Sequence, residues 1–147
     1  MLRVAPLYAL VAVMITIGVL HFVAEGFFVQ IVPPQLPAPL FLVQLSGVIE
    51  IALGLLLLPE RTRRLAGYAL ILLFIAVFPA NVYMAVDNVQ LQNMPEWFVQ
   101  PSPLLLWLRL PLQFVFIYWA LAVAKTGAPL GSSSSTKSST NSSTNAS

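Results

Sequence analysis

The sequence contains no cysteine and a single histidine, His21. The lack of cysteine excludes disulfide bonds, cysteine-ligated metal sites and an internal dithiol relay. One histidine does not supply the usual ligands of haem or of an iron–sulfur cluster, and it cannot build a zinc site unaided. We therefore expect no metal centre and identify no cofactor from these residues. Electrons in any redox reaction would travel on a bound molecule or on a partner.

Charge is also scarce, since charged residues make up 8% of the chain, against about 25% in a soluble domain. The formal net charge of +2 is too small to indicate a nucleic-acid partner. Hydrophobic residues make up 59% of the sequence, and the mean hydropathy is +0.87. This composition is typical of a membrane protein, whose principal partner is the lipid bilayer.

Apolar residues form long runs with little interruption, and each run is long enough to cross about 30 Å of hydrocarbon as a helix. The runs span residues 4–22, 40–58, 65–86 and 104–124. They do not alternate as a membrane strand would. The first run follows Arg3 as a signal peptide might, but no cleavage pattern follows it, so we expect it to be retained. The sequence predicts an all-α fold, a four-helix transmembrane bundle within residues 1–126.

Basic residues indicate the orientation of the bundle. The connection between the second and third runs carries Arg61, Arg63 and Arg64, whereas residues 23–39 and 87–103 contain no lysine or arginine. By the positive-inside rule, the basic connection and both termini are cytoplasmic, and the two long loops face outward.

The first outer loop combines an apolar stretch, residues 27–32, with a proline-rich segment, residues 33–39. We favour an interfacial anchor lying on the lipid headgroups; the alternative is a lid over an outward-facing cavity. The second outer loop is expected to pack beside the first. Its apolar residues are Met94, Pro95, Trp97 and Phe98. Residues 127–147 are rich in serine, threonine and asparagine, a composition that predicts a disordered tail.

A few polar residues interrupt the apolar runs, and they are the candidate ligand-binding residues. These residues are His21, Ser46, Glu50, Asn81, Arg109 and Gln113. The helical rise places them in the outer half of the bundle, with Glu50 close to the midplane. Arg109 lies one helical turn from Gln113 on the same face, and Ser46 shares the face of Glu50.

The cost of burying charge in lipid predicts that these groups converge. A charge that faces lipid at the bilayer centre costs about 2.5–3.5 kcal/mol, so we expect Glu50 and Arg109 to face inward and to meet, directly or through water. Pro79 frees a backbone carbonyl that Asn81 or water must help to satisfy. Gly47 and Gly54 form a neighbouring stripe along which helices can approach closely.

Each polar residue also has a structural interpretation. A pair of Glu50 and Arg109 would fix the register of the bundle, Asn81 would repair the proline kink, and His21 would pair with Glu25 at the membrane interface. Gln113 alone would be an interhelical hydrogen bond. Because polar groups from all four runs gather in one half of the membrane, we favour a ligand-binding site over a pair that only fixes the register.

Several segments resemble DoxX-like small membrane proteins of bacteria, across roughly residues 10 to 125. The most specific is Phe78-Pro79-Ala80-Asn81-Val82-Tyr83-Met84-Ala85. Two further segments are Leu45-Ser46-Gly47-x-x-Glu50-Ile51-x-x-Gly54 and Arg109-x-Pro111-Leu112-Gln113. The resemblance implies a four-helix protein of the bacterial inner membrane. Relatives in the wider family are associated with thiosulfate:quinone oxidoreduction or with membrane complexes that handle oxidative stress.

Three functions remain open at this point. The first is a quinone- or small-ligand-binding subunit of a membrane oxidoreductase system, with other redox subunits as partners. The second is a structural or assembly partner in a membrane complex. The third is a small transporter, which is disfavoured because the inner half of the four runs has almost no polar residues. No Ser-His-Asp set indicates a hydrolase, and the sequence assigns no catalytic residue.

Overall fold

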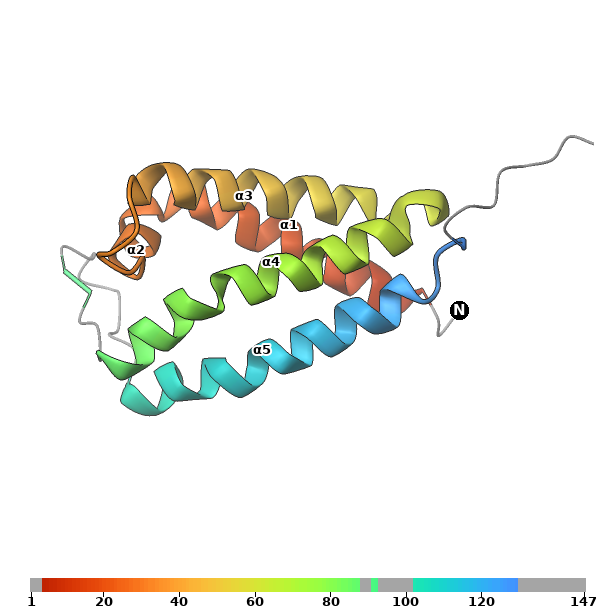
Figure 1. The fold of residues 1–147 in the computed structure, drawn as a ribbon. Coiled ribbons are helices and arrows are strands. Elements are labelled where there is room, and N and C mark those ends of the chain that lie inside the picture. The colour runs from red at the N-terminus through yellow and green to blue at the C-terminus, as the bar shows by residue number, and fades with distance from the viewer. Residues whose placement is uncertain (1–3, 88–90, 93–101, 130–147) are drawn as a thin grey trace, which may run out of the picture.

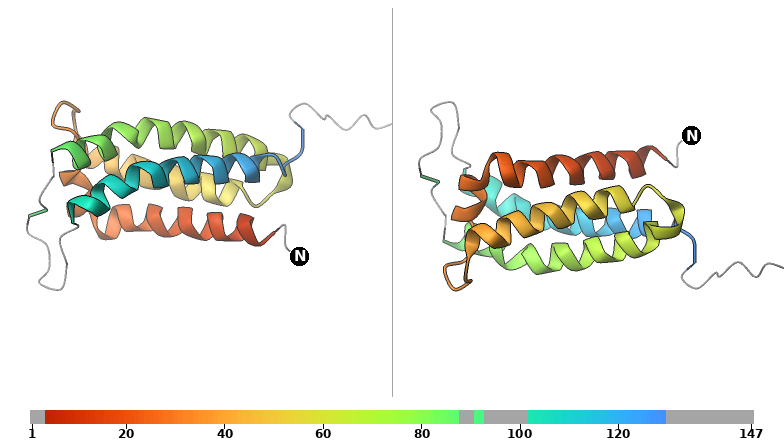
Figure 2. Two further views of the ribbon diagram at one scale, coloured as in Figure 1. Left: turned by 90° about the horizontal axis from the view of Figure 1, so that it is seen from below. Right: turned by 90° about the horizontal axis from the view of Figure 1, so that it is seen from above.

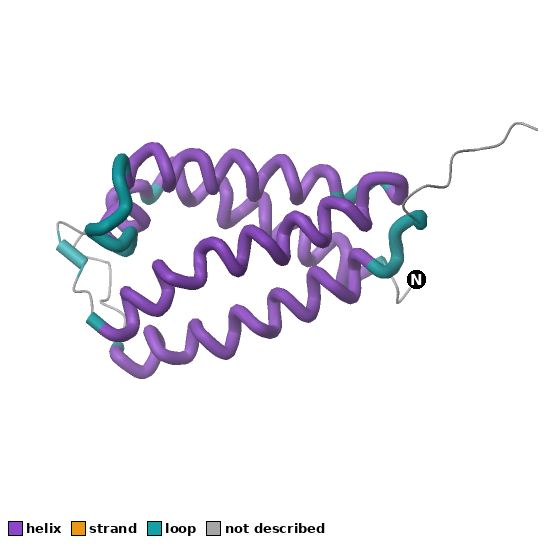
Figure 3. Tube along the Cα trace, viewed as in Figure 1, coloured by secondary structure: helices purple, strands orange, loops and turns teal. Residues whose placement is uncertain are grey.

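The computed structural model describes residues 4–87, 91–92 and 102–129, and within these ranges the protein is helical and has no strands (Figures 1 and 3). The helices are α1 (Ala5–Val23), α2 (Glu25–Gln30), α3 (Pro39–Leu56), α4 (Glu60–Val86) and α5 (Pro103–Ala124). The all-α prediction is confirmed, and α1, α3, α4 and α5 are long and apolar enough to cross a membrane. The tail beyond residue 129 and the second-loop residues Met94, Pro95, Trp97 and Phe98 lie outside the described ranges.

Local sequence signals explain where the helices begin and end. Proline lies in the first turn of α1, α3 and α5, where its missing N–H costs nothing. α4 begins at Glu60 rather than at Leu65, so the basic cluster belongs to its first turns. Two of its side chains cap the end of α3: Thr62 Oγ1 donates to the Leu56 carbonyl at 2.7 Å, and Arg63 Nε donates to the Leu57 carbonyl at 2.9 Å.

The bundle consists of two closely packed helix pairs, α1 with α3 and α4 with α5 (Figures 1 and 2). The first pair is close because Gly47 of α3 faces α1, where a Cβ on Gly47 would lie only 2.9 Å from the Gly18 carbonyl oxygen. A Cβ on Gly67 of α4 would lie 3.0 Å from Cα of Ala124 in α5. The predicted close approach along Gly47 and Gly54 is thus confirmed, with α1 as the partner.

Basic residues gather at one end of the bundle. The start of α1, the turn between α3 and α4 and the end of α5 lie together, and Ala128 N–H donates to the Glu60 carbonyl at 3.0 Å (Figure 1). Arg61, Arg64 and Lys125 therefore lie at one end. We call this end the basic end, and we call the opposite end, formed by α2 and the start of α5, the α2 end (Figure 1).

Two apolar clusters close the two ends. The larger fills the bundle towards the basic end, and its fully buried members include Leu10, Met14, Leu57 and Leu70. The smaller lies at the α2 end and is made of Ile31, Met84, Ala85, Leu91 and Leu106, with Phe27, Phe28 and Leu110 packed against it. The polar residues of the helices lie between the two clusters.

Candidate functional site

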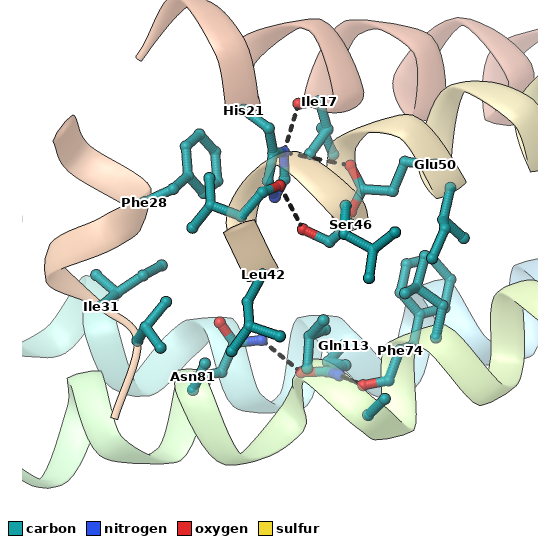
Figure 4. Close-up of a pocket in the computed structure, with 18 of the residues that line it drawn as sticks. Ile17, His21, Phe28, Ile31, Leu42, Ser46, Glu50, Phe74, Asn81 and Gln113 are labelled. Carbon is teal, nitrogen blue, oxygen red and sulfur yellow. Dashed lines mark hydrogen bonds and ion pairs between the residues drawn. The ribbon is translucent and has the colours of Figure 1, made fainter. Parts of the chain in front are cut away.

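A cavity of about 560 Å³ lies between the helix pairs (Figure 4). All six residues that the sequence singled out line it, namely His21, Ser46, Glu50, Asn81, Arg109 and Gln113. Side chains from α1, α3, α4 and α5 therefore meet around one space, as the cost of exposing them to lipid predicts. The rest of the lining is largely apolar and aromatic.

Glu50 is 6% exposed and has His21 as its basic neighbour. The distance from Glu50 Oε2 to His21 Nδ1 is 3.4 Å, but Nδ1 lies closer, at 2.8 Å, to the Ile17 carbonyl oxygen (Figure 4). A carbonyl only accepts, so Nδ1 carries a proton and donates it to Ile17. Glu50 Oε2 accordingly has no hydrogen-bond partner among the described residues.

The alternative in which His21 pairs with Glu25 is wrong. Glu25 begins α2 and accepts a hydrogen bond from Gln44 Nε2 at 3.4 Å. His21 instead remains on the inner face of α1, where its ring stacks on Phe28 with 3.9 Å between ring centroids. The chain turns between α1 and α2, so the one-turn spacing from His21 to Glu25 does not continue along a single helix.

The guanidinium of Arg109 contacts a sulfur atom and an aromatic ring rather than a carboxylate. Nη1 lies 3.4 Å from Sδ of Met84, and the guanidinium carbon lies 5.6 Å from the centroid of the Phe27 ring. Sulfur is a weak acceptor and an aromatic face is a modest partner for a cation. Across the described part of the chain, no carboxylate forms an ion pair with Arg109.

The direct form of the predicted contact between Glu50 and Arg109 is therefore wrong, although both residues line the same cavity, and a contact through water stays a prediction. The reason is the pairing of the helices, because Glu50 belongs to the α1–α3 pair and Arg109 to the α4–α5 pair. The sequence indicates that both residues face inward, but it does not indicate which helices pack most closely.

The amides of Asn81 and Gln113 form a chain of hydrogen bonds within the second pair. Asn81 Nδ2 donates to Gln113 Oε1 at 2.7 Å, and Gln113 Nε2 donates to the Phe74 carbonyl (Figure 4). Phe74 directly precedes Ile75, whose carbonyl loses its helical partner at Pro79. Gln113 on α5 thus bonds to the carbonyl next to the one that the proline frees, Asn81 holds Gln113, and the predicted repair of the freed carbonyl by Asn81 or water stays a prediction.

Ser46 lines the cavity with its hydroxyl already engaged. Its Oγ donates to the Val43 carbonyl of the same helix at 2.9 Å. A hydroxyl oxygen retains acceptor capacity after it donates. Ser46 therefore can accept a hydrogen bond from a molecule in the cavity.

α2 covers one end of the cavity. Phe27 and Phe28 line the cavity, and Gln30 holds the helix to the second loop. Gln92 N–H donates to Gln30 Oε1 at 2.6 Å, and Gln30 Nε2 donates to the Gln92 carbonyl at 3.1 Å. The packing of these aromatic rings agrees with the alternative of a lid, and the interfacial anchor stays a prediction.

The sequence did not single out Phe27, Phe28 and Met84 as site residues. The residue types alone do not mark these positions as part of a site, because aromatic residues and methionine are common in any apolar segment. Phe27 and Phe28 follow His21 within two turns, and a break in the helix between them folds α2 back over the cavity. That break has no strong sequence signal, since no proline or glycine precedes Glu25 in the turn.

Taken together, the fold and the cavity define a multi-pass, four-helix membrane protein in which every long helix contributes a polar side chain to one internal space. The chain belongs to the family described as "Domain of unknown function (DUF8561)", whose family model matches residues 10–124. No curated protein and no solved structure matches the chain. The resemblance to DoxX-like proteins stays a prediction.

Proposed function

We propose that this protein is a ligand-binding subunit of a membrane redox system, and that its cavity binds the polar ring of a quinone or quinol. One observation carries the proposal. Glu50 and Arg109 line the same cavity, and neither has a partner of opposite fixed charge among the described residues.

The energetics of charge in an apolar medium favour a ligand over a purely structural role. A carboxylate and a guanidinium that served only to fix the register would gain most by forming a direct ion pair. Here the two groups remain apart on different helix pairs. A quinol ring has hydroxyl groups at opposite edges, so the oxygen of one accepts from Arg109 while the other hydroxyl donates to the Glu50 carboxylate.

The size and lining of the cavity agree with such a ligand. Small-molecule pockets usually measure about 300–1,000 Å³ and combine an apolar wall with a few polar groups, and this cavity of about 560 Å³ has that character. Phe27, Phe28 and Phe116 supply aromatic surface for a flat ring. The electrons would be exchanged with a partner subunit, because the sequence offers no metal or thiol centre.

The two alternative functions have unequal support. The hydrogen bonds from Asn81 to Gln113 and from Gln113 to Phe74 favour an architectural contribution by these two amides. A transporter needs a continuous polar path, and the apolar cluster around Met14 and Leu70 blocks such a path towards the basic end. We therefore retain the structural role as the second candidate.

Replacing Glu50 by glutamine should weaken quinol binding at least about tenfold, because the charge-assisted hydrogen bond from a quinol hydroxyl to the carboxylate contributes about 1.5–3 kcal/mol. The measurement is a titration of the purified full chain with decylubiquinol under reducing conditions, together with the quinone that co-purifies with the chain, extracted and quantified by its oxidised-minus-reduced absorbance. Glu60→Gln is the matched control, since Glu60 lies at the basic end and lines no part of the cavity. Arg109→Gln, with Arg61→Gln as control, should behave in the same way.

Two results would contradict the proposal. One is the absence of quinol binding by the wild-type protein. The other is equal binding by Glu50→Gln and Glu60→Gln, since that would leave the carboxylate in the cavity without a role in recognition.

We further propose that the basic end of the bundle is cytoplasmic, in the inner membrane of a bacterium. The support is the location of Arg61, Arg64 and Lys125 at one end of the four long helices and of Glu25 and Asp87 at the other. A green fluorescent protein fused after residue 129 should fluoresce, and an alkaline phosphatase inserted after Leu36 should be active. Active phosphatase at the C-terminal position would reverse the assignment.

A further inference from the structure

The described contacts close the cavity at both ends. Towards the basic end, Phe74 and its apolar neighbours form a packed floor. At the other end lie Phe27 and Phe28 of α2, and α2 is held in place by the paired hydrogen bonds between Gln30 and Gln92. These contacts obstruct the route along the axis of the bundle.

The seam within each helix pair is also closed at the depth of the cavity. In the first pair, a Cβ on Gly47 would lie 2.7 Å from Cβ of His21, which shows how closely the backbones approach. In the second pair, the hydrogen bond between Asn81 and Gln113 joins α4 to α5. The remaining routes are the two seams between the pairs, α1 with α5 and α3 with α4.

The seam between α3 and α4 has two small side chains on its α4 side. Ala76 and Ala80 of α4 line the cavity, and the α3 side of the lining includes Leu42, Leu45, Ser46 and Ile49. Leu45 is 42% exposed and Ala76 is also exposed, so these residues lie both on the cavity wall and on the surface that faces lipid. The described hydrogen bonds between α3 and α4 lie at their connecting turn, far from this opening.

The seam between α1 and α5 is more obstructed. The cavity wall there carries the large side chains of Arg109 and Phe116. Nearer the basic end, Trp119 Nε1 donates to the Pro6 carbonyl at 3.0 Å and ties α5 to α1. The α3–α4 seam is therefore the better route to the lipid.

We propose that the ligand of this cavity is a tailed lipid-type molecule, whose polar ring lies between Glu50 and Arg109 and whose hydrocarbon tail passes between α3 and α4 into the bilayer. This inference rests on the proposed function. Glu50 supplies the independent sign of a ligand, because it is 94% buried (6% exposed), lines the cavity and leaves Oε2 without a hydrogen-bond partner in the described part of the chain. Access and release then occur from within the membrane, with α2 remaining closed.

The test narrows the seam and compares two probes. Ala76→Phe places a large ring between α3 and α4, and the full-length variant is titrated with a dimethoxy-methyl-benzoquinol bearing a decyl tail and with the same quinol ring without the tail. We expect the tailed probe to bind at least about tenfold more weakly, equivalent to about 1.4 kcal/mol, while the tailless ring binds as it does to the wild type.

Ala52→Phe is the matched control, because Ala52 is an exposed residue of α3 that does not line the cavity. It should bind both probes like the wild-type protein. If Ala76→Phe does not give a folded protein by circular dichroism, Ala76→Leu tests the same seam with a smaller side chain.

The outcomes separate this inference from the proposed function. Two results would overturn the inference that the tail passes through this seam. In one, Ala76→Phe binds both probes as tightly as the wild-type protein does. In the other, Ala76→Phe binds both probes more weakly and by the same factor. In either case, binding of the tailless ring that still depends on Glu50 would leave the proposed function intact. Failure of the tailless ring and of the tailed probe to bind the wild type would overturn the proposed function itself.

Discussion

Replacing Gly47 by leucine should destabilise the protein more than any other single change considered. A Cβ at this position would lie 2.7 Å from Cβ of His21 and 2.9 Å from the Gly18 carbonyl oxygen. The second of these atoms belongs to the backbone of α1, so it cannot move without moving the helix. Overpacking a close contact costs about 1–3 kcal/mol and sometimes more, and the extra atoms of leucine place Gly47→Leu at the upper end. Thermal unfolding in detergent, followed by circular dichroism, measures the loss.

Gly26→Ala is the control for this experiment. Gly26 lies inside α2, and a Cβ added there meets no atom within 4 Å. Alanine is also the better helix former, by about 1 kcal/mol, so Gly26→Ala should unfold at the wild-type temperature or slightly above it. If Gly47→Leu unfolds together with Gly26→Ala, the close packing of α1 against α3 is not what holds the first helix pair.

Replacing Gln113 by leucine should be the second most damaging change. Gln113 is 5% exposed and bonds both to Asn81 and to the Phe74 carbonyl. Leucine fills a similar volume but leaves the amide of Asn81 without its acceptor and removes the second hydrogen bond of the Phe74 carbonyl. An unsatisfied buried polar group costs about 1–3 kcal/mol, and we expect a loss of about 2 kcal/mol in the same unfolding measurement.

Two variants show whether Gln113 is the centre of this network. Gln44→Leu makes the same chemical change in α3, where Gln44 has a single exposed hydrogen bond to Glu25, and it should have little effect. Asn81→Leu should cost less than Gln113→Leu, because the bond from Gln113 to Phe74 survives. An equal loss for the two variants would mean that Asn81 contributes more than its bond to Gln113.

Much of the architecture follows from the sequence because the bilayer imposes it. Uninterrupted apolar runs have to form helices in lipid, and the four long helices agree with the predicted spans to within a few residues, apart from the early start of α4. The same reasoning indicated that the polar residues turn inward, and all six of them line one cavity. Gly47 and Gly54 correctly marked a face of close helix packing.

The partners of the polar side chains could not be predicted in the same way. The free-energy cost of exposing a charge to lipid does not depend on which neighbour the charge meets inside the bundle. This cost explains why Glu50 faces inward, but it does not select Arg109 over His21 as its neighbour. The selection depends on the packing of α1 against α3, which a single sequence does not encode in an obvious pattern. The position of α2 is a similar case, because the aromatic pair Phe27 and Phe28 suits an interface with lipid as well as it suits the cavity.

The division into two helix pairs also implies an order in which the parts of the protein fold during synthesis. α1, α2 and α3 leave the ribosome before α4 and α5, so the tight contact of α1 with α3 can form while the second half is still being synthesised. At that stage Glu50 has His21 beside it, and the wall that carries Arg109 does not yet exist. The cavity is complete only when the α4–α5 pair docks against the first pair, because α4 and α5 supply one of its walls.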